Sequence, residues 1–185
     1  DGTDRSVPVE TLVVGDLVAT RVTGDDVVIT EILPRRTTLE RASGPDGPRR
    51  LIAANADILL VVESLTRPEP RPHLIDRYLV AAWVGGLDAA VVLTKADLAS
   101  DPAAVESLSA LYSGLGYPVL VGSAKDATLV DAIRRQLDGR VGALVGQSGV
   151  GKSTLTRGLT GVDRAVGEVS DRDGTGRHTT SDPRL

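Results

Sequence analysis

Eight residues at positions 146–153, GQSGVGKS, have the types and spacing of a phosphate-binding loop. They match G-x-x-x-x-G-K-[ST] at every fixed position, after an apolar segment. Glycines let successive backbone N–H groups turn towards phosphate oxygens, and a following helix adds the field of its N-terminus. In such a loop Lys152 reaches the β- and γ-phosphates, as the catalytic cation, and the Ser153 hydroxyl binds Mg²⁺. The residues predicted to bind the nucleotide here are Gly146, Gln147, Ser148, Gly149, Val150, Gly151, Lys152, Ser153 and Thr154.

The segment LTKADL, residues 93–98, indicates which base the nucleotide carries. Asp97 follows an apolar run, and its carboxylate can accept two N–H donors from guanine, a pair that adenine lacks. The Lys95 stem can lie along the face of the base, and Thr94 can hydrogen-bond towards the phosphate loop. A simple surface helix start remains the alternative. The predicted guanine loop consists of Thr94, Lys95, Ala96 and Asp97.

The segment GSAKD, residues 122–126, also follows an apolar run. Ser123, Ala124 and Lys125 match a short loop, here called the SAK loop, whose backbone N–H at the Ala meets the guanine carbonyl oxygen. A serine that caps a helix is the alternative. The chain has only three lysines, and all three lie in these nucleotide segments.

The segment GRHTT, residues 176–180, contains two threonines downstream of the phosphate loop. One of them, Thr179 or Thr180, can close over Mg²⁺ and the γ-phosphate. The choice between the two stays open, and His178 is a weaker candidate for a general base.

Composition excludes several classes of protein. The chain is 41% hydrophobic and 25% charged, which is typical of a folded globular protein. It has no apolar run of about 18 residues, so we expect no membrane span. Cysteine is absent, which excludes disulfides and thiolate metal sites within this sequence, and the net charge of −4 argues against a polycation. We expect a cytoplasmic monomer and, because the sequence lacks methionine, a fragment without its natural ends.

The N-terminal part contains short β-like runs in residues 7–33, with the turn signal TGDD between them. They indicate a small, partial β-barrel. Residues 34–50 are rich in Arg, Pro and Gly and read as an exposed linker. Arg35, Arg36 and Arg41 are either solvated or contact a phosphate backbone. We therefore predict a partial barrel with its linker over 1–50 and a nucleotide domain over 51–185.

From residue 56 onwards, apolar runs alternate with segments of helical spacing. Such alternation predicts a mainly parallel sheet covered by helices on both faces, a three-layer α/β domain. One helix should bury Leu74, Tyr78, Leu79 and Ala82, and another should begin at Ser100 or Asp101. The predicted strands are 57–64, 89–94, 117–123 and 140–146, and the predicted helices are 73–86, 100–116, 127–137 and 152–161.

The motifs occur in an unusual order. The guanine loop and the SAK loop precede the phosphate loop, whereas ordinary GTPases begin with the phosphate loop. Circular permutation converts one order into the other and preserves the pocket, because the sheet decides where the loops meet. The chain resembles the ribosome small-subunit-dependent GTPase A family of bacterial circularly permuted GTPases over nearly all of residues 8–185. The resemblance lies in ILPRRTTLERAS, LIAANAD, RPHLIDRYLVAAW, VVLTKADL, GQSGVGKSTL, GEVS and GRHTT.

The resemblance implies an oligonucleotide-binding (OB) type barrel, a permuted P-loop GTPase domain and a C-terminal zinc domain. It implies hydrolysis of GTP to GDP, with Mg²⁺, stimulated by the small ribosomal subunit and its rRNA during late maturation of that subunit. The barrel begins late here, and the DxxG loop and zinc domain are not in this sequence, so zinc is expected only outside it. The missing DxxG loop and the local excess of arginine leave an alternative: an rRNA-binding module whose nucleotide site is a switch or inactive. An unrelated ATP-using enzyme is disfavoured by TKAD and SAK.

Overall fold

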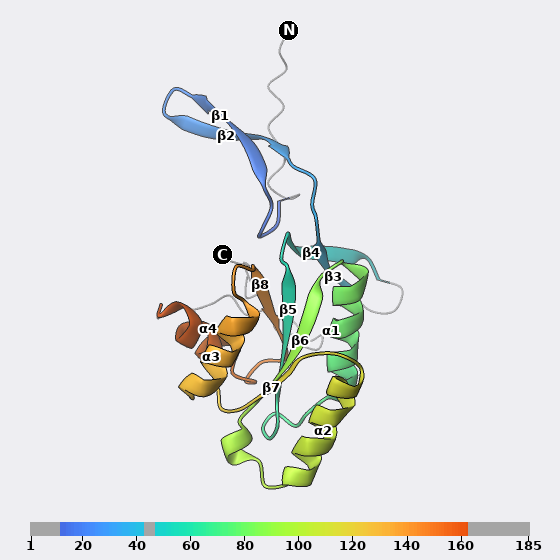
Figure 1. The fold of residues 1–185 in the computed structure, drawn as a ribbon. Coiled ribbons are helices and arrows are strands. Elements are labelled where there is room, and N and C mark those ends of the chain that lie inside the picture. Colours follow the sequence, from blue (N-terminus) through green and yellow to red (C-terminus); the bar gives the residue numbers. More distant parts are fainter. Residues whose placement is uncertain (1–11, 43–46, 163–185) are drawn as a thin grey trace.

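A four-stranded parallel sheet forms the centre of the computed structural model, which describes residues 12–42 and 47–162 (Figure 1). Its strands lie in the order β7-β6-β5-β8. The register pairs Ile58 with Asp88 and Ser64 with Thr94, so β5 and β6 end at the same level. The strands are β5 (Ile58–Ser64), β6 (Asp88–Thr94), β7 (Val119–Val121) and β8 (Gly142–Val145).

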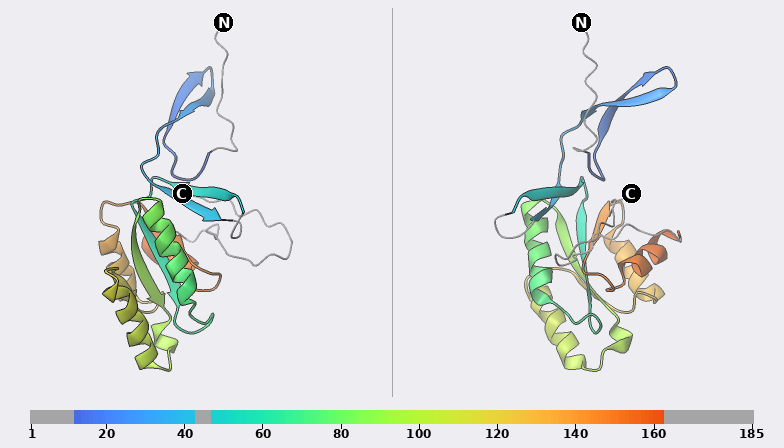
Figure 2. Two further views of the ribbon diagram at one scale, coloured as in Figure 1. Left: turned by 90° about the vertical axis from the view of Figure 1, so that its right-hand side faces the viewer. Right: turned by 180° about the vertical axis from the view of Figure 1, so that it is seen from behind.

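Helices cover both faces of this sheet, as Figures 1 and 2 show. Alternate residues of β5 point to opposite faces. Leu59 and Val61 join the core beneath α1 and α2, whereas Leu60 and Val62 join the core beneath α3 and α4. The predicted three-layer α/β domain is confirmed. The helices are α1 (Pro72–Val84), α2 (Pro102–Gly114), α3 (Ala127–Gln136) and α4 (Lys152–Thr160).

Side-chain caps fix where two of these helices begin. Asp101 caps α2 by accepting hydrogen bonds from the backbone N–H groups of Ala103 and Ala104, which resolves the choice between Ser100 and Asp101. Asp126 caps α3 in the same way, through the N–H of Thr128. No helix in the described part of the chain has the length and apolar character needed to cross a bilayer.

The predicted N-terminal strands form an antiparallel hairpin of β1 (Val18–Thr23) and β2 (Asp26–Ile32). Gly24 and Asp25 make its turn. The hairpin projects from the nucleotide domain (Figure 1), and among the described residues it is a two-stranded sheet of its own rather than a closed barrel. Val22 and Val27 are mostly exposed on it. The antiparallel pairing is consistent with a partial OB-type region.

The prediction of an exposed linker over 34–50 is wrong for part of that range. The structure instead has β3 (Thr38–Ala42) and β4 (Arg49–Ala54), paired antiparallel. Leu39 is only 3% exposed and packs into the core beside α1, together with Ile52. Four exposed charged side chains, Glu40, Arg41, Arg49 and Arg50, give the segment the composition of a loop.

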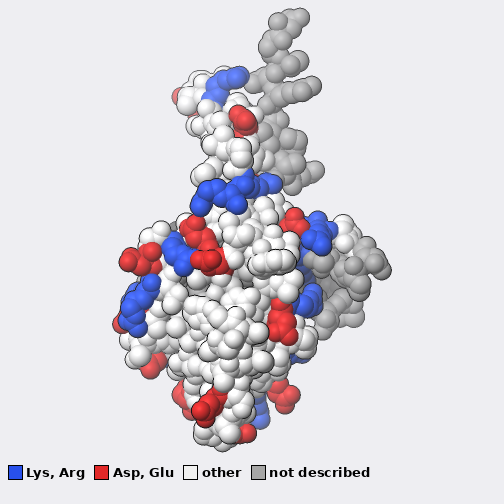
Figure 3. Space-filling model, turned by 45° about the vertical axis from the view of Figure 1, so that its right-hand side comes forward, with Lys and Arg blue, Asp and Glu red and all other residues white. Residues whose placement is uncertain are grey.

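A hydrogen-bonded junction joins the β1–β2 hairpin to the nucleotide domain. Asn55 adopts a left-handed conformation (φ +58°), donates its side-chain amide to the Gly15 carbonyl and accepts from the Arg36 N–H, both at 2.8 Å. Arg35 binds both carboxylate oxygens of Asp16, at 2.6 and 2.8 Å, and lowers the pKa of that carboxyl. Basic side chains gather at this junction in the space-filling view (Figure 3).

Arg36 completes the junction by donating to the Asp57 carboxylate at 3.1 Å. Arg35 and Arg36 are thus engaged with carboxylates of the chain itself. Their predicted contact with a phosphate backbone stays a prediction, and the structure gives both a part in joining the two regions.

Candidate functional site

The three predicted nucleotide loops meet at the carboxyl end of the sheet, where ligands bind in open α/β folds. The guanine loop follows β6, the SAK loop follows β7 and the phosphate loop follows β8. The Ala96 N–H donates to the Gly122 carbonyl at 3.1 Å, which joins the guanine loop to the residue before the SAK loop. A Cβ added at Gly151 would lie 3.3 Å from the Ala124 Cβ and 3.9 Å from the Thr94 hydroxyl. Segments far apart in the sequence therefore form one site.

The phosphate loop has the predicted context of a strand before it and a helix after it, with β8 ending at Val145 and α4 beginning at Lys152. All three of its glycines have a positive φ, a conformation that favours glycine. Gly146 has φ +145°, and a Cβ there would lie 2.1 Å from the Val62 carbonyl oxygen. Gly151 has φ +104°. The loop therefore presses closely against β5 and turns directly into the N-terminus of α4.

Lys152 is buried at the start of α4. Its ammonium donates hydrogen bonds to the carbonyl oxygens of Gly146 and Gln147, each at 2.9 Å. Ser153 is exposed on the first turn of the same helix and Thr154 is half-buried. The lysine therefore lies inside the curve of its own loop, where two carbonyl oxygens of that loop accept from it.

Thr94 links the guanine loop to the phosphate loop. Its side chain is fully buried, and its hydroxyl lies 2.5 Å from the Val150 carbonyl oxygen and 3.1 Å from that of Glu63. The predicted hydrogen bond of Thr94 towards the phosphate loop is confirmed.

Thr94→Val keeps the shape of the side chain and removes this hydroxyl. We expect the free energy of unfolding to fall by about 1–3 kcal/mol, because a buried carbonyl loses its donor. For a chain of this size that corresponds to a drop in Tm of about 2–4 °C per kcal/mol. Thermal unfolding followed by circular dichroism measures it. Thr94→Ser retains the hydroxyl and should lose less, and a Val variant as stable as the wild type would contradict the role of this bond.

The guanine loop and the SAK loop each have one exposed charged side chain at the same end of the sheet, Asp97 and Lys125. Lys95 is left-handed (φ +59°), and its ammonium donates to the Arg67 carbonyl. Asp97 is exposed and lies in the 3₁₀ turn Ala96–Leu98. Ala124 is 9% exposed, while Lys125 is exposed. The Asp97 carboxylate is thus open to a ligand, and it is carried on a backbone that is fixed to β6.

Glu63 is a residue of the site that the sequence analysis missed. It lies on β5, is 1% exposed, and its carboxylate accepts from the Gln147 side-chain amide at 2.8 Å and from the Ser64 N–H at 3.1 Å. Burial raises the pKa of Glu63, against the opposing effect of these hydrogen bonds. The available signal was an acidic residue inside an otherwise apolar strand.

Glu63→Gln should stabilise the protein at neutral pH by a few degrees in Tm. Because the folded-state pKa is raised above the unfolded value, the wild type loses stability as the pH rises through the interval between the two. The variant carries no such charge, so its advantage should be present above the folded-state pKa and shrink below the unfolded value. Thermal unfolding from pH 4 to pH 8 checks this, and a Tm difference independent of pH would contradict it.

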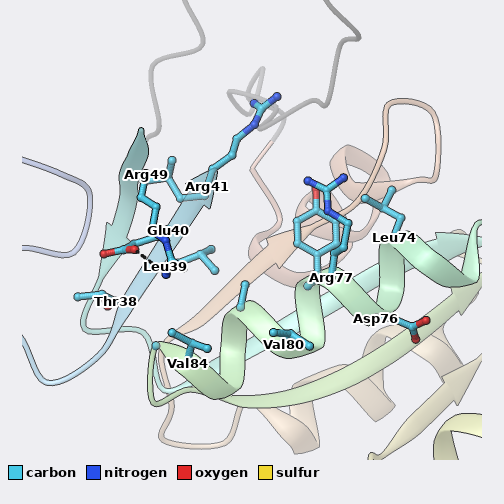
Figure 4. A pocket seen from close by; sticks show the side chains of 14 residues that line it. Thr38, Leu39, Glu40, Arg41, Arg49, Leu74, Asp76, Arg77, Val80 and Val84 are labelled. Atoms are coloured by element: carbon cyan, nitrogen blue, oxygen red, sulfur yellow. Dashed lines mark ion pairs between the residues drawn. The ribbon is translucent and has the colours of Figure 1, made fainter. Parts of the chain in front are cut away.

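Three of the predicted residues cannot be compared with these loops. Thr179, Thr180 and His178 lie outside the described residues. Within 12–42 and 47–162 no three His, Cys, Asp or Glu side chains gather as a metal site, and the Mg²⁺ role of Ser153 stays a prediction. A groove of about 610 Å³ lies between the β3–β4 ribbon and α1 (Figure 4), and no residue of the three loops lines it.

Comparison with known proteins gives consistent matches. The sequence model of the RsgA GTPase family matches residues 32–185. The small ribosomal subunit biogenesis GTPase RsgA of Pseudomonas aeruginosa is 44% identical over 180 residues, covering 94% of this chain and 52% of the relative. The protein of that name from Azotobacter vinelandii is 44% identical over 181 residues, covering 94% of this chain and 51% of the relative. The chain spans about half the length of the curated relatives it matches.

Solved structures also align with this chain. YjeQ from Thermotoga maritima aligns with a TM-score of 0.63 and 31% identity over 81% of this chain and 51% of that one. YloQ, a circularly permuted GTPase, aligns with a TM-score of 0.60 and 28% identity over 80% of this chain and 50% of that one. The permuted loop order, the contacts between the loops and these matches lead to one conclusion: the chain belongs to the RsgA GTPase family.

Proposed function

We propose that this chain binds GTP and GDP and forms the nucleotide-hydrolysing part of a GTPase that acts in biogenesis of the small ribosomal subunit. The observation that carries the proposal is the meeting of the guanine, SAK and phosphate loops, tied together through Thr94 and Val150. The names of the relatives supply the biological setting. The partners are then the small subunit and its rRNA, met by a monomer in the bacterial cytoplasm.

The guanine loop and the SAK loop recognise the base in this proposal. The Asp97 carboxylate accepts two N–H donors of guanine, and adenine would leave it without them. The Ala124 N–H donates to the guanine carbonyl oxygen, and the Lys95 stem covers one face of the ring. Because the Ala96 N–H is hydrogen-bonded to the Gly122 carbonyl, the two loops keep a fixed spacing.

The phosphate loop binds the charged end of the nucleotide. Backbone N–H groups and the N-terminus of α4 face the phosphate oxygens, and Lys152 exchanges its neutral carbonyl acceptors for phosphate. Mg²⁺, which Ser153 would help to hold, neutralises charge on the β- and γ-phosphates when bound. Water attacks the γ-phosphorus and the bond to the bridging oxygen breaks, while Lys152 stabilises the charge that develops. Thr179 or Thr180, outside the described residues, would close over the γ-phosphate.

Calorimetric titration of this chain with Mg²⁺–GDP and with Mg²⁺–ADP tests the binding step. Tight GDP binding with weak ADP binding is expected. A longer form of the protein, mixed with purified small subunits, should then release phosphate from GTP faster than without them. Equal affinity for GDP and ADP would overturn the guanine assignment, and no binding of either would overturn the nucleotide function of this chain.

A second candidate function, rRNA binding, is favoured by one feature of the β3–β4 ribbon. Arg41 and Arg50 lie directly opposite each other on the two strands, and both are exposed. Two like charges in such a pair oppose folding. An anionic backbone bound across them would offset the repulsion between the two guanidinium groups.

Replacing both arginines by Ala should weaken binding to the small subunit and reduce the dependence of log K on log salt concentration by up to about two units. Arg134→Ala/Arg135→Ala on α3 removes the same charge elsewhere and serves as the control. An unchanged salt dependence in the Arg41/Arg50 variant would exclude this surface.

A further inference from the structure

Glu63 lies directly beneath the phosphate loop. The loop begins where Gly146 touches the Val62 carbonyl, one residue before Glu63 on β5. The Glu63 side chain is 1% exposed on a strand whose other six residues are all buried and, Ser64 apart, apolar. A carboxylate in such a place costs free energy unless it is hydrogen-bonded. The buried Glu63 carboxylate therefore needs a hydrogen-bond donor, and the phosphate loop supplies it.

The partner is Gln147, the second residue of the phosphate loop. Its side-chain amide is 7% exposed and donates to the Glu63 carboxylate at 2.8 Å. The same nitrogen lies 3.3 Å from the carbonyl oxygen of Glu69, in the segment between β5 and α1. The Gln147 side chain thus points inward, away from the nucleotide, and anchors the loop to the sheet.

The backbone of Gln147 meets the phosphate-binding lysine. Its carbonyl oxygen accepts from the Lys152 ammonium at 2.9 Å, as does that of Gly146. Gln147 therefore connects the two residues: its side chain is hydrogen-bonded to the Glu63 carboxylate, and its backbone carbonyl is hydrogen-bonded to the Lys152 ammonium. A long, flexible glutamine is held at both its side-chain and its backbone end.

We propose that Glu63 is a positioning residue of the nucleotide site, which fixes the phosphate loop for binding by holding the side-chain amide of Gln147. This inference rests on the proposed nucleotide binding by the same loop. Taking a carboxylate out of water costs free energy that hydrogen bonds from neutral donors offset only in part. Stability alone therefore does not account for a carboxylate here, whereas the ordering of Gln147 does.

Glu63→Leu removes the acceptor from a strand that is apolar apart from Ser64, and the Gln147 amide keeps the Glu69 carbonyl as a partner, so the variant should fold. We expect the affinity for Mg²⁺–GDP to fall about tenfold, which corresponds to about 1.4 kcal/mol. Glu63→Gln keeps a side-chain oxygen at the same distance along the chain and should bind GDP within about twofold of the wild type, a change of about 0.4 kcal/mol. Glu69→Leu is the matched control, because that side chain is exposed and only its backbone carbonyl approaches Gln147.

A double-mutant cycle separates positioning from a general effect on the fold. Gln147→Leu alone should also weaken GDP binding about tenfold, and Glu63→Leu/Gln147→Leu should be no weaker than either single variant, because both remove the same bond. In the protein without nucleotide, the NMR signal of the Gln147 side-chain amide should move when Glu63 becomes Leu and not when Glu69 does.

The outcomes are distinct. A wild type that binds no guanine nucleotide overturns the proposed function and this inference with it. A wild type that binds GDP, with Glu63→Leu binding it equally well, overturns this inference alone. Additive losses in the double variant also overturn it, because they would show that the two residues act separately.

Discussion

Asp97→Asn is expected to lower the affinity for GDP by about 10- to 100-fold while leaving the fold intact. In the proposed complex the carboxylate accepts two N–H groups of guanine, and hydrogen bonds to a charged group contribute about 1.5–3 kcal/mol. An amide offers one oxygen and one donor, so one of the two guanine N–H groups faces another N–H. Titration calorimetry measures the affinity for GDP, and circular dichroism checks that the fold is intact.

Xanthine nucleotides provide a sharper readout, because xanthine has a carbonyl where guanine has its exocyclic amino group. The Asn amide can donate to that oxygen, so Asp97→Asn should bind xanthosine diphosphate better than the wild type does. Asp138→Asn, which changes an exposed acid beyond the site, is the control and should bind GDP normally. An Asp97 variant that keeps its preference for GDP over ADP would show that another residue reads the base.

Most of the sheet could be predicted because its strands are buried on both faces. The runs DILLVVES and AAVVLT become β5 and β6, the two central strands, whereas the strand order and the register came from the structure. Parallel strands of this kind are continuous apolar segments, and their carboxyl ends place the loops. The permuted order of the motifs therefore had no effect on the prediction that the loops meet.

The β3–β4 ribbon, the junction and the Glu63 contact could not be predicted, because they depend on contacts between residues that are distant in the sequence. Among their described residues β3 and β4 fully bury only Leu39 and Ala54, and four exposed charged side chains conceal the strands in the sequence. The left-handed Asn55 and the pairing of Arg35 with Asp16 follow from the hairpin meeting the sheet. Glu63 was visible as an anomaly in an apolar strand, but its partner lies 84 positions away in the sequence.

The buried Lys152 side chain has two roles, one in nucleotide binding and one in holding its own loop. In the proposed complex its ammonium is the cation for the phosphates, and in the structure it donates to two carbonyls of its own loop. Lys152→Met keeps the unbranched chain and removes both roles. We expect GDP affinity to fall by about 10- to 150-fold, from the loss of a charged hydrogen bond worth about 1.5–3 kcal/mol. GTP hydrolysis by the longer protein should fall below detection, as phosphate-release assays would show.

Lys152→Arg should not rescue this variant, although it restores the positive charge. The guanidinium is planar and larger than an ammonium, and its donors lie in a fixed fork. The space it would enter is enclosed by the Gly146 and Gln147 carbonyls, at 2.9 Å from the present nitrogen. Arg157→Met, on the exposed side of α4, removes a cation from the same helix and should bind GDP normally. GDP binding by Lys152→Arg at the wild-type level would show that charge alone suffices, and that the enclosed geometry of the loop does not select lysine.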